Sequence, residues 1–245
     1  DYRLQPDSPA LQLGIQSIDL SQVGLYGEAE WVNKPKAVQR PEMVFPKPKT
    51  PQPVAEDFES TPVGEQTVNA VTGRGENGAC ILVTDETAAT GKHSLKFVDA
   101  AGQAQTWMPH MYWTPDFKRG VCMTSFDLRV EPGAKLYHEW RNAGGSYLAG
   151  PSIHIEPNGA LLVGGKELLK VPHSAWFHVE IRCKLGTVAD GTFDLSITLP
   201  GEQPQTFAGL ACGRKEFRRL QWLGFISEAT DTAVFYLDNV KCSVP

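Results

Sequence analysis

Hydrophobic and polar side chains alternate with a period of two over much of the chain after residue 55. In residues 176–185 the odd positions are Phe, Val, Ile, Cys and Leu, and the even positions are mostly polar or charged. Residues 192–199 and 121–131 repeat the pattern. Such alternation is typical of β-strands that are packed on one face and solvated on the other. It predicts that this part of the chain is all-β.

Shorter apolar runs bounded by turn residues predict further strands. These lie at 79–83, 93–98, 151–156, 159–163, 220–227 and 233–240. The connection between 176–185 and 192–199 contains Asp190-Gly191 and is short, so these two strands should form a hairpin. The number of strands predicts two packed antiparallel sheets, a β-sandwich of the jelly-roll type, over residues 55–245.

Composition excludes several functional classes. The chain has 245 residues, of which 41% are hydrophobic and 21% charged, values typical of globular domains. Its net charge of −5 argues against nucleic-acid binding, which needs a basic face. No apolar run approaches the ~20 residues that cross a membrane. The five cysteines lack a CxxC spacing and do not indicate a zinc site.

Two segments precede the predicted sandwich. Residues 33–54 contain six Pro and five Lys or Arg, which predicts either an extended spacer or a strap ordered on a domain surface. Residues 1–32 have short apolar runs interrupted by Pro and Gly, too few to bury a core of their own. We therefore expect residues 1–32 to dock on another structure.

The first segment has a more specific pattern. It resembles the closing rung of right-handed parallel β-helix proteins of the pectate-lyase-like class. The matching residues are 1–4, Pro6, 8–10, Gly14 and 23–27. The resemblance implies that residues 1–32 cap a β-helix. It also implies an N-terminal β-helix partner domain with glycoside hydrolase or polysaccharide lyase activity, in a secreted, extracellular or periplasmic protein.

The sandwich region carries a second resemblance. An early Asp57-Phe58-Glu59, a strand at 176–181 and a closing strand at 235–240 are similar to concanavalin A-like or laminin G-like jelly rolls. The closing strand also occurs in galactose-binding-like sandwiches. Such modules are common accessories of secreted carbohydrate-active enzymes, so the resemblance implies a polysaccharide or oligosaccharide partner.

The same resemblance implies a structural Ca²⁺ between the first and last strands. It nominates oxygen ligands from Asp57, Glu59, Asp238 and Asn239. Calcium needs several such oxygens around it. In the alternative interpretation, Asp57 and Glu59 are solvated charges at a strand edge and Asp238 caps a turn.

Two stretches, 106–117 and 136–155, concentrate residues that bind sugars. Three of the six Trp and three of the six His lie between 107 and 154. Aromatic rings stack on apolar sugar faces, while charged and polar groups bind hydroxyls. The candidate ligand-binding residues are His110, Tyr112, Trp113, His138, Glu139, Trp140, Arg141 and Tyr147. In the alternative interpretation the rings belong to the core of the sandwich.

These observations favour a non-catalytic carbohydrate-binding module that holds an attached enzyme near its polysaccharide. No catalytic residue is assigned. Two alternatives remain: a polysaccharide lyase or glycoside hydrolase with its site around 138–154, and a purely structural cap of a β-helix enzyme.

Overall fold

A computed structural model describes the protein. The described residues are 4–16, 23–39, 50–73, 75–142 and 147–245. The chain divides into two units, Asp1–Pro48 and Lys49–Pro245. None of the described helices is long and apolar enough to cross a membrane.

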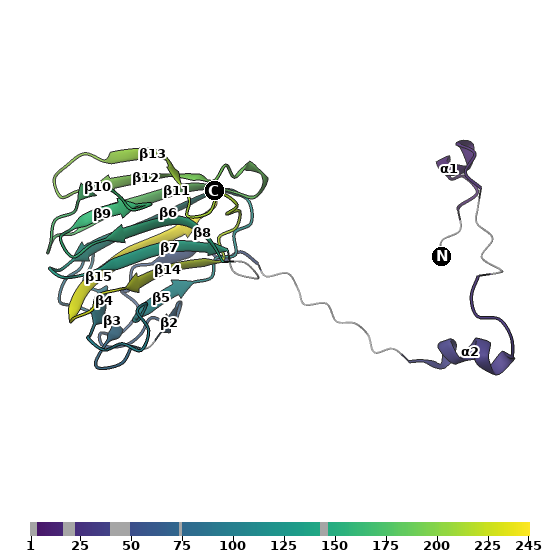
Figure 1. The fold of residues 1–245 in the computed structure, drawn as a ribbon, viewed down its shortest axis with the longest axis horizontal. Helices are drawn as coiled ribbons and strands as arrows, with labels where there is room; N and C mark the ends of the chain where they lie inside the picture. The colour runs from purple at the N-terminus through teal and green to yellow at the C-terminus, as the bar shows by residue number, and fades with distance from the viewer. Residues whose placement is uncertain (1–3, 17–22, 40–49, 74, 143–146) are drawn as a thin grey trace. The chain divides into compact units, whose positions relative to one another are not determined.

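The second unit consists of two antiparallel β-sheets, as the alternating pattern predicts (Figure 1). Sheet A runs in the order β13 (Gln205–Ala211), β12 (Thr192–Thr198), β11 (Phe177–Leu185), β6 (Gly120–Val130), β15 (Ala233–Ser243), β4 (Ser94–Asp99) and β3 (Cys80–Thr84), with β1 (Val54–Glu56) paired to β15. Sheet B runs in the order β10 (Lys166–Lys170), β9 (Ala160–Val163), β8 (Leu148–Ile155), β7 (Leu136–Asn142), β14 (Trp222–Ser227), β5 (His110–Trp113) and β2 (Val71–Gly73). The predicted antiparallel two-sheet β-sandwich is confirmed.

The predicted hairpin is also present. Strand β11 pairs with β12, and a short 3-10 helix, η1 (Gly186–Val188), lies in the connection between them. The burial of β11 and β12 alternates residue by residue, as a strand with one packed face requires.

The core lies between the inner faces of the two sheets. Phe126 of β6 meets Phe225 of β14 edge to face, with ring centroids 4.9 Å apart, and so joins sheet A to sheet B. Phe97 and Phe235 stack at 4.2 Å within sheet A. All four rings are buried. Burying each such side chain contributes about 1.5–3 kcal/mol, so these aromatic contacts stabilise the pairing of the two layers.

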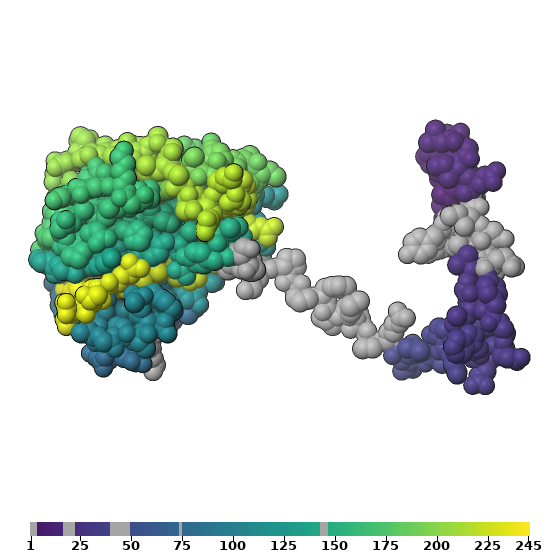
Figure 2. All heavy atoms as spheres, viewed as in Figure 1, coloured from purple at the N-terminus to yellow at the C-terminus, as the bar shows by residue number. Residues whose placement is uncertain are grey.

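The last strand occupies the middle of sheet A. Strand β15 pairs with β6 on one side and with β4 on the other, and β1 also pairs with it. Figure 2 shows late residues, in yellow, beside early ones, in blue, on the surface of this unit. The sandwich therefore depends on pairings between the two ends of the unit.

The first unit contains two short helices, α1 (Pro9–Gln12) and α2 (Ala29–Ala37). Helix α1 begins after Ser8, whose Oγ accepts a hydrogen bond from the backbone N–H of Ala10 at 3.3 Å. A serine cap followed by proline at the first helical position is a favourable helix start. None of the described residues of this unit is buried, in agreement with the prediction that it has no core of its own.

Two expectations for the first unit need correction. The described part of residues 1–32 contains helix rather than the strands of a β-helix rung. Residues 33–37 of the expected extended linker are helical, and Pro35 lies inside α2. Proline disfavours a helix interior but does not forbid it, so composition alone was misleading here. Residues 40–49 of the linker lie outside the described residues.

Candidate functional site

Most of the candidate sugar-binding residues lie on two strands of sheet B. His110, Tyr112 and Trp113 belong to β5, and the run 138–141 belongs to β7. Strand β14 pairs with both, so the two strands flank it on either side. The sequence interpretation did not predict these strands. Because successive side chains of a strand point to opposite faces, adjacent candidates have opposite environments.

Three of the candidates point into the core. Trp113 is 5% exposed, and His138 and Trp140 are fully buried. The Trp140 indole N–H donates to Nε2 of His138 at 3.2 Å, and Nδ1 of His138 lies 2.9 Å from the carbonyl oxygen of Gly224. Nδ1 therefore carries the proton, and burial lowers the pKa of His138 to about 3. The expectation that these three residues contact a sugar is wrong; they hold sheet B together from inside.

The remaining candidates belong to the outer face of sheet B or its border. Around them is a hollow of about 370 Å³. It is lined by Trp107, His110, Tyr137, Arg141, Tyr147, Trp222, Ile226 and Glu228. We call this hollow the sheet B groove. The structure thus brings His110, Arg141 and Tyr147 together, and Tyr112 lies beside them.

Aromatic rings form the floor of the sheet B groove. The indole of Trp222 lies across Gly224, where any Cβ would overlap with the ring. Tyr112 stacks on Trp222 at 5.2 Å, and His110 stacks on Tyr112 at 6.1 Å. The guanidinium carbon of Arg141 lies 3.8 Å from the centre of the Trp222 ring. This cation–π contact holds the guanidinium over the floor of the groove.

Glu139 is the anchor of the groove rather than part of its surface. It is fully buried, and its carboxylate accepts hydrogen bonds from Nε of Arg141 and, at 2.6 Å, from the hydroxyl of Tyr147. Burial and the hydrogen bond to Glu139 raise the pKa of Tyr147 to about 12. The same two causes raise the pKa of Tyr137. Both phenols therefore stay protonated at neutral pH, and Glu139 cannot itself touch a ligand.

The two histidines of this face are uncharged at neutral pH. His154 of β8 stacks on Tyr137 with ring centroids 4.1 Å apart. Burial lowers the pKa of His154 and of His110. The face thus combines neutral imidazoles, protonated phenols, the guanidinium of Arg141 and the carboxylate of Glu228, which lies 3.9 Å from Nδ1 of His154.

The candidate list drawn from the sequence lacks Tyr137, Trp222 and Glu228, although Tyr137 belongs to the stretch 136–155 that the sequence singled out. The side chains of Tyr137 and Trp222 point to the same face of sheet B as that of Arg141. Tyr137 precedes Arg141 by four residues on β7, and Trp222 of β14 is paired with Arg141. The signal that could have identified Tyr137 is the period of two through residues 136–142. Trp222 could be identified only from the pairing of β14 with β7.

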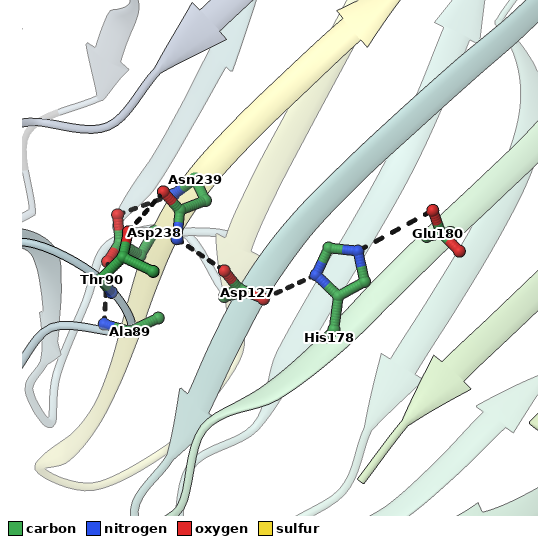
Figure 3. Close-up of polar contacts among 7 residues, drawn as sticks. All are labelled: Ala89, Thr90, Asp127, His178, Glu180, Asp238 and Asn239. Carbon is green, nitrogen blue, oxygen red and sulfur yellow. Dashed lines mark hydrogen bonds and ion pairs between the residues drawn. The ribbon is translucent and has the colours of Figure 1, made fainter. Parts of the chain in front are cut away.

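The residues nominated for calcium hold a loop. Asp238 is fully buried and accepts backbone N–H groups from Ala89 at 2.8 Å, Thr90 at 3.2 Å and Asn239 at 2.7 Å (Figure 3). Burial raises the pKa of Asp238 to about 6. Asn239 donates to Asp127 at 2.7 Å. These bonds attach the loop 85–93 to the middle of β15, next to its register shift between Asp238 and Lys241.

Glu59 holds the other end of the same loop. It accepts the backbone N–H groups of Lys92 at 2.7 Å and His93 at 2.8 Å, and these two bonds lower its pKa. Asp57 accepts the N–H of Glu59 at 3.2 Å. Within the described part of the chain, no three acidic, His or Cys side chains form a metal cluster. In this arrangement the four residues do not fit a Ca²⁺ ion, because the carboxylates face N–H donors; calcium binding stays a prediction.

Comparison with solved structures found proteins of similar fold. The endo-beta-1,4-glucuronan lyase from the fungus Trichoderma reesei has a TM-score of 0.53 and 14% identity, over 80% of this chain and 96% of the lyase. The cellulose-induced protein Cip1 has a TM-score of 0.50 and 17% identity, over 78% of this chain and 97% of Cip1. No protein-family model and no curated protein matches the sequence. At these identities the likeness shows the fold alone: the chain has the two-sheet β-sandwich fold of these proteins.

Proposed function

We propose that this protein is a carbohydrate-binding module whose sheet B groove binds a polysaccharide containing acidic sugars. The observation that carries the proposal is the setting of Arg141. Its Nε is held by Glu139 and its guanidinium lies on Trp222, while no described residue accepts a hydrogen bond from its two Nη groups. A planar fork with free donors matches the carboxylate of a uronic acid.

Exposed aromatic rings complete the proposed binding site. Trp107 is 49% exposed and Tyr147 is 59% exposed, and both line the groove beside Arg141. Rings in this position offer flat apolar area to the C–H face of a sugar with few rotamers to restrict. Arg141 would then select the charge of the sugar, and the rings would supply contact area.

Affinity electrophoresis tests the proposal. In native gels containing polyglucuronate we expect the wild-type chain to be retarded. Arg141→Ala should weaken binding by about 10–100-fold, as expected when a hydrogen bond to a charged group worth about 1.5–3 kcal/mol is lost. Added salt should weaken retention, because the ion pair between Arg141 and the carboxylate of the polymer is partly exposed to solvent.

Lys166→Ala is the matched control. It removes one positive charge from an exposed position of β10, away from the residues that line the groove. It should leave retention unchanged. Equal losses in Arg141→Ala and Lys166→Ala would mean that net charge, not the groove, governs binding. Absence of retardation by acidic and neutral polymers alike would favour the structural role.

A lyase is the second candidate function, and the neutral His154 beside Tyr137 favours it. In β-elimination, Arg141 would neutralise the uronate carboxylate, a neutral imidazole would take the C5 proton, and a protonated tyrosine would protonate the leaving oxygen. The fold-related glucuronan lyase is named for such a substrate. Incubation with polyglucuronate tests this function, because elimination produces an unsaturated sugar with ultraviolet absorbance. Binding without that product favours the module.

The wider context stays part of the proposal. A binding module raises the effective concentration of an attached enzyme at its polymer. We propose that this protein works in this way outside the cytoplasm, attached to a catalytic β-helix domain. The open reading frame upstream of Asp1 tests the attachment: a β-helix sequence with an export signal supports it, and an unrelated sequence opposes it.

A further inference from the structure

A second hollow of about 470 Å³ lies on sheet A, the opposite layer of the sandwich. It is lined by residues of β15, β6, β11, β12 and β13. Ile181 and Leu195 beneath it belong to the core, whereas their neighbours Glu180 and Arg182 are exposed. The hollow therefore opens on the outer face of sheet A and shares no residue with the sheet B groove.

Strand register arranges the polar side chains of this hollow in two parallel rows. The first row runs Lys241, Ser125, Glu180, Ser196, Thr206, each opposite the next on a neighbouring strand. The second row runs Ser243, Met123, Arg182, Asp194. Since neighbouring strands lie about 4.8 Å apart, the first row spans roughly 19 Å across five strands. This is the shape of a track for an extended oligomer.

The groups in the track have capacity for a ligand. Over the described residues, neither Arg182 nor Lys241 has an ion-pair or hydrogen-bond partner at its charged end. Glu180 has only His178 Nε2 at 4.0 Å (Figure 3). Met123 is 46% exposed between these polar groups. The hollow therefore offers unpaired polar groups and one exposed thioether to a molecule that has both polar and apolar parts.

The charges in the track select the kind of ligand. Arg182 and Lys241 are balanced by Glu180 and Asp194, so the track has no net charge. A polyanion would meet two carboxylates, and a polycation would meet two cations. A neutral sugar chain can use all four groups, because its hydroxyls both donate and accept hydrogen bonds and its C–H faces suit Met123.

We propose that the outer face of sheet A is a second binding site, specific for a neutral polysaccharide. The two layers of the sandwich would then bind different polymers, an acidic one on sheet B and a neutral one on sheet A. The site is independent of the sheet B groove, so either proposal can fail alone.

The test uses the full chain in native gels that contain hydroxyethyl cellulose or β-1,4-galactan. We expect at least one of these neutral polymers to retard the wild type. Glu180→Ala and Met123→Lys should each weaken this retention by about tenfold, the loss expected for one good polar or packing contact. Glu167→Ala, an exposed carboxylate of β10 outside the hollow, is the matched control and should bind as wild type does.

Three results would overturn the proposal. The first is that neither neutral polymer retards the wild type. The second is that both sheet A variants, folded by circular dichroism, are retarded as strongly as wild type. The third is that these variants lose retention by polyglucuronate, which would assign the track to acidic chains. If Glu180→Ala does not fold, Glu180→Gln replaces it, because it keeps the shape and removes the charge.

Discussion

At the scale of single residues, the candidate site is divided by the pleat of one strand. His138 and Trp140 lie in the core, whereas Glu139 and Arg141 belong to the other face of β7. The inner pair is joined by a hydrogen bond, and the outer pair by an ion pair. Loss of an inner residue should therefore affect stability, and loss of an outer residue should affect binding.

Tryptophan substitutions test this division. Trp140→Ala should lower the free energy of unfolding by about 3–5 kcal/mol, because it leaves a cavity in a packed core. Trp107→Ala removes a half-exposed ring and should change stability by less than about 0.5 kcal/mol while weakening retention by polyglucuronate. Denaturant unfolding and affinity electrophoresis of both variants check the prediction. The reverse pattern would show that the faces are wrongly assigned.

Glu139→Gln tests the anchor of the groove. The substitution keeps the shape of the side chain but removes the charge that faces Arg141 and the Tyr147 hydroxyl. The pKa of Tyr147, raised to about 12 by burial and by Glu139, should fall, and retention by polyglucuronate should weaken. NMR titration of labelled tyrosine measures the pKa. An unchanged Tyr147 pKa would mean that Glu139 does not position this hydroxyl.

At the scale of elements, a polar network connects a loop to sheet A. Asp238 holds the loop 85–93, Asn239 bonds to Asp127, and Asp127 lies 2.6 Å from Nδ1 of His178 (Figure 3). The network thus links β15, β6 and β11. The stability that this network contributes should depend on pH, because the pKa values of Asp238 and His178 are shifted.

We expect the melting temperature to fall as the pH rises from about 4 to about 6. Burial raises the pKa of Asp238 from 3.8 to about 6, so in this range the folded chain keeps a proton that the unfolded chain has lost. The hydrogen bond to Asp127 raises the pKa of His178, and its contribution is lost at higher pH, as His178 loses its proton. Asp238→Asn should flatten the lower part of the pH profile. A variant profile parallel to that of wild type would contradict the assignment.

Calcium binding is tested on the same loop. If Ca²⁺ takes the place of the N–H partners of Glu59 and Asp238, EDTA should lower the melting temperature and added Ca²⁺ should restore it. Asp238→Asn should abolish the response, and Glu167→Ala should retain it. A melting temperature that changes with neither EDTA nor added Ca²⁺ would exclude a structural calcium ion.

At the scale of the whole molecule, the second unit should fold alone. Among the described residues, every buried hydrophobic core residue lies at or after Val54, and none of the first unit is buried. A chain starting at Lys49 should therefore keep the wild-type melting temperature and its retention in both gels. Differential scanning calorimetry and the gel assays measure this. A clearly lower melting temperature would show that the first unit packs on the sandwich.

The sequence predicted the strongly alternating strands β6, β11 and β12 well. It missed β5 and β7. Inward positions of these strands hold His138, Trp113 and Trp140, which are residue types that also bind sugars at protein surfaces. The sequence alone does not distinguish a buried histidine from one that binds a ligand. The hydrogen bonds of His138 to Gly224 and Trp140 show that it is a core residue.

The sequence by itself determined the β-class, the hairpin and the lack of a core before the sandwich, because these follow from side-chain alternation and composition along neighbouring residues. Only the tertiary structure decided which rings are buried and which residues share a face. That decision depends on the pairing of β14 with β5 and β7, and of β15 with β6 and β4. Such pairings join residues far apart in the chain, and the packing of two whole sheets selects them.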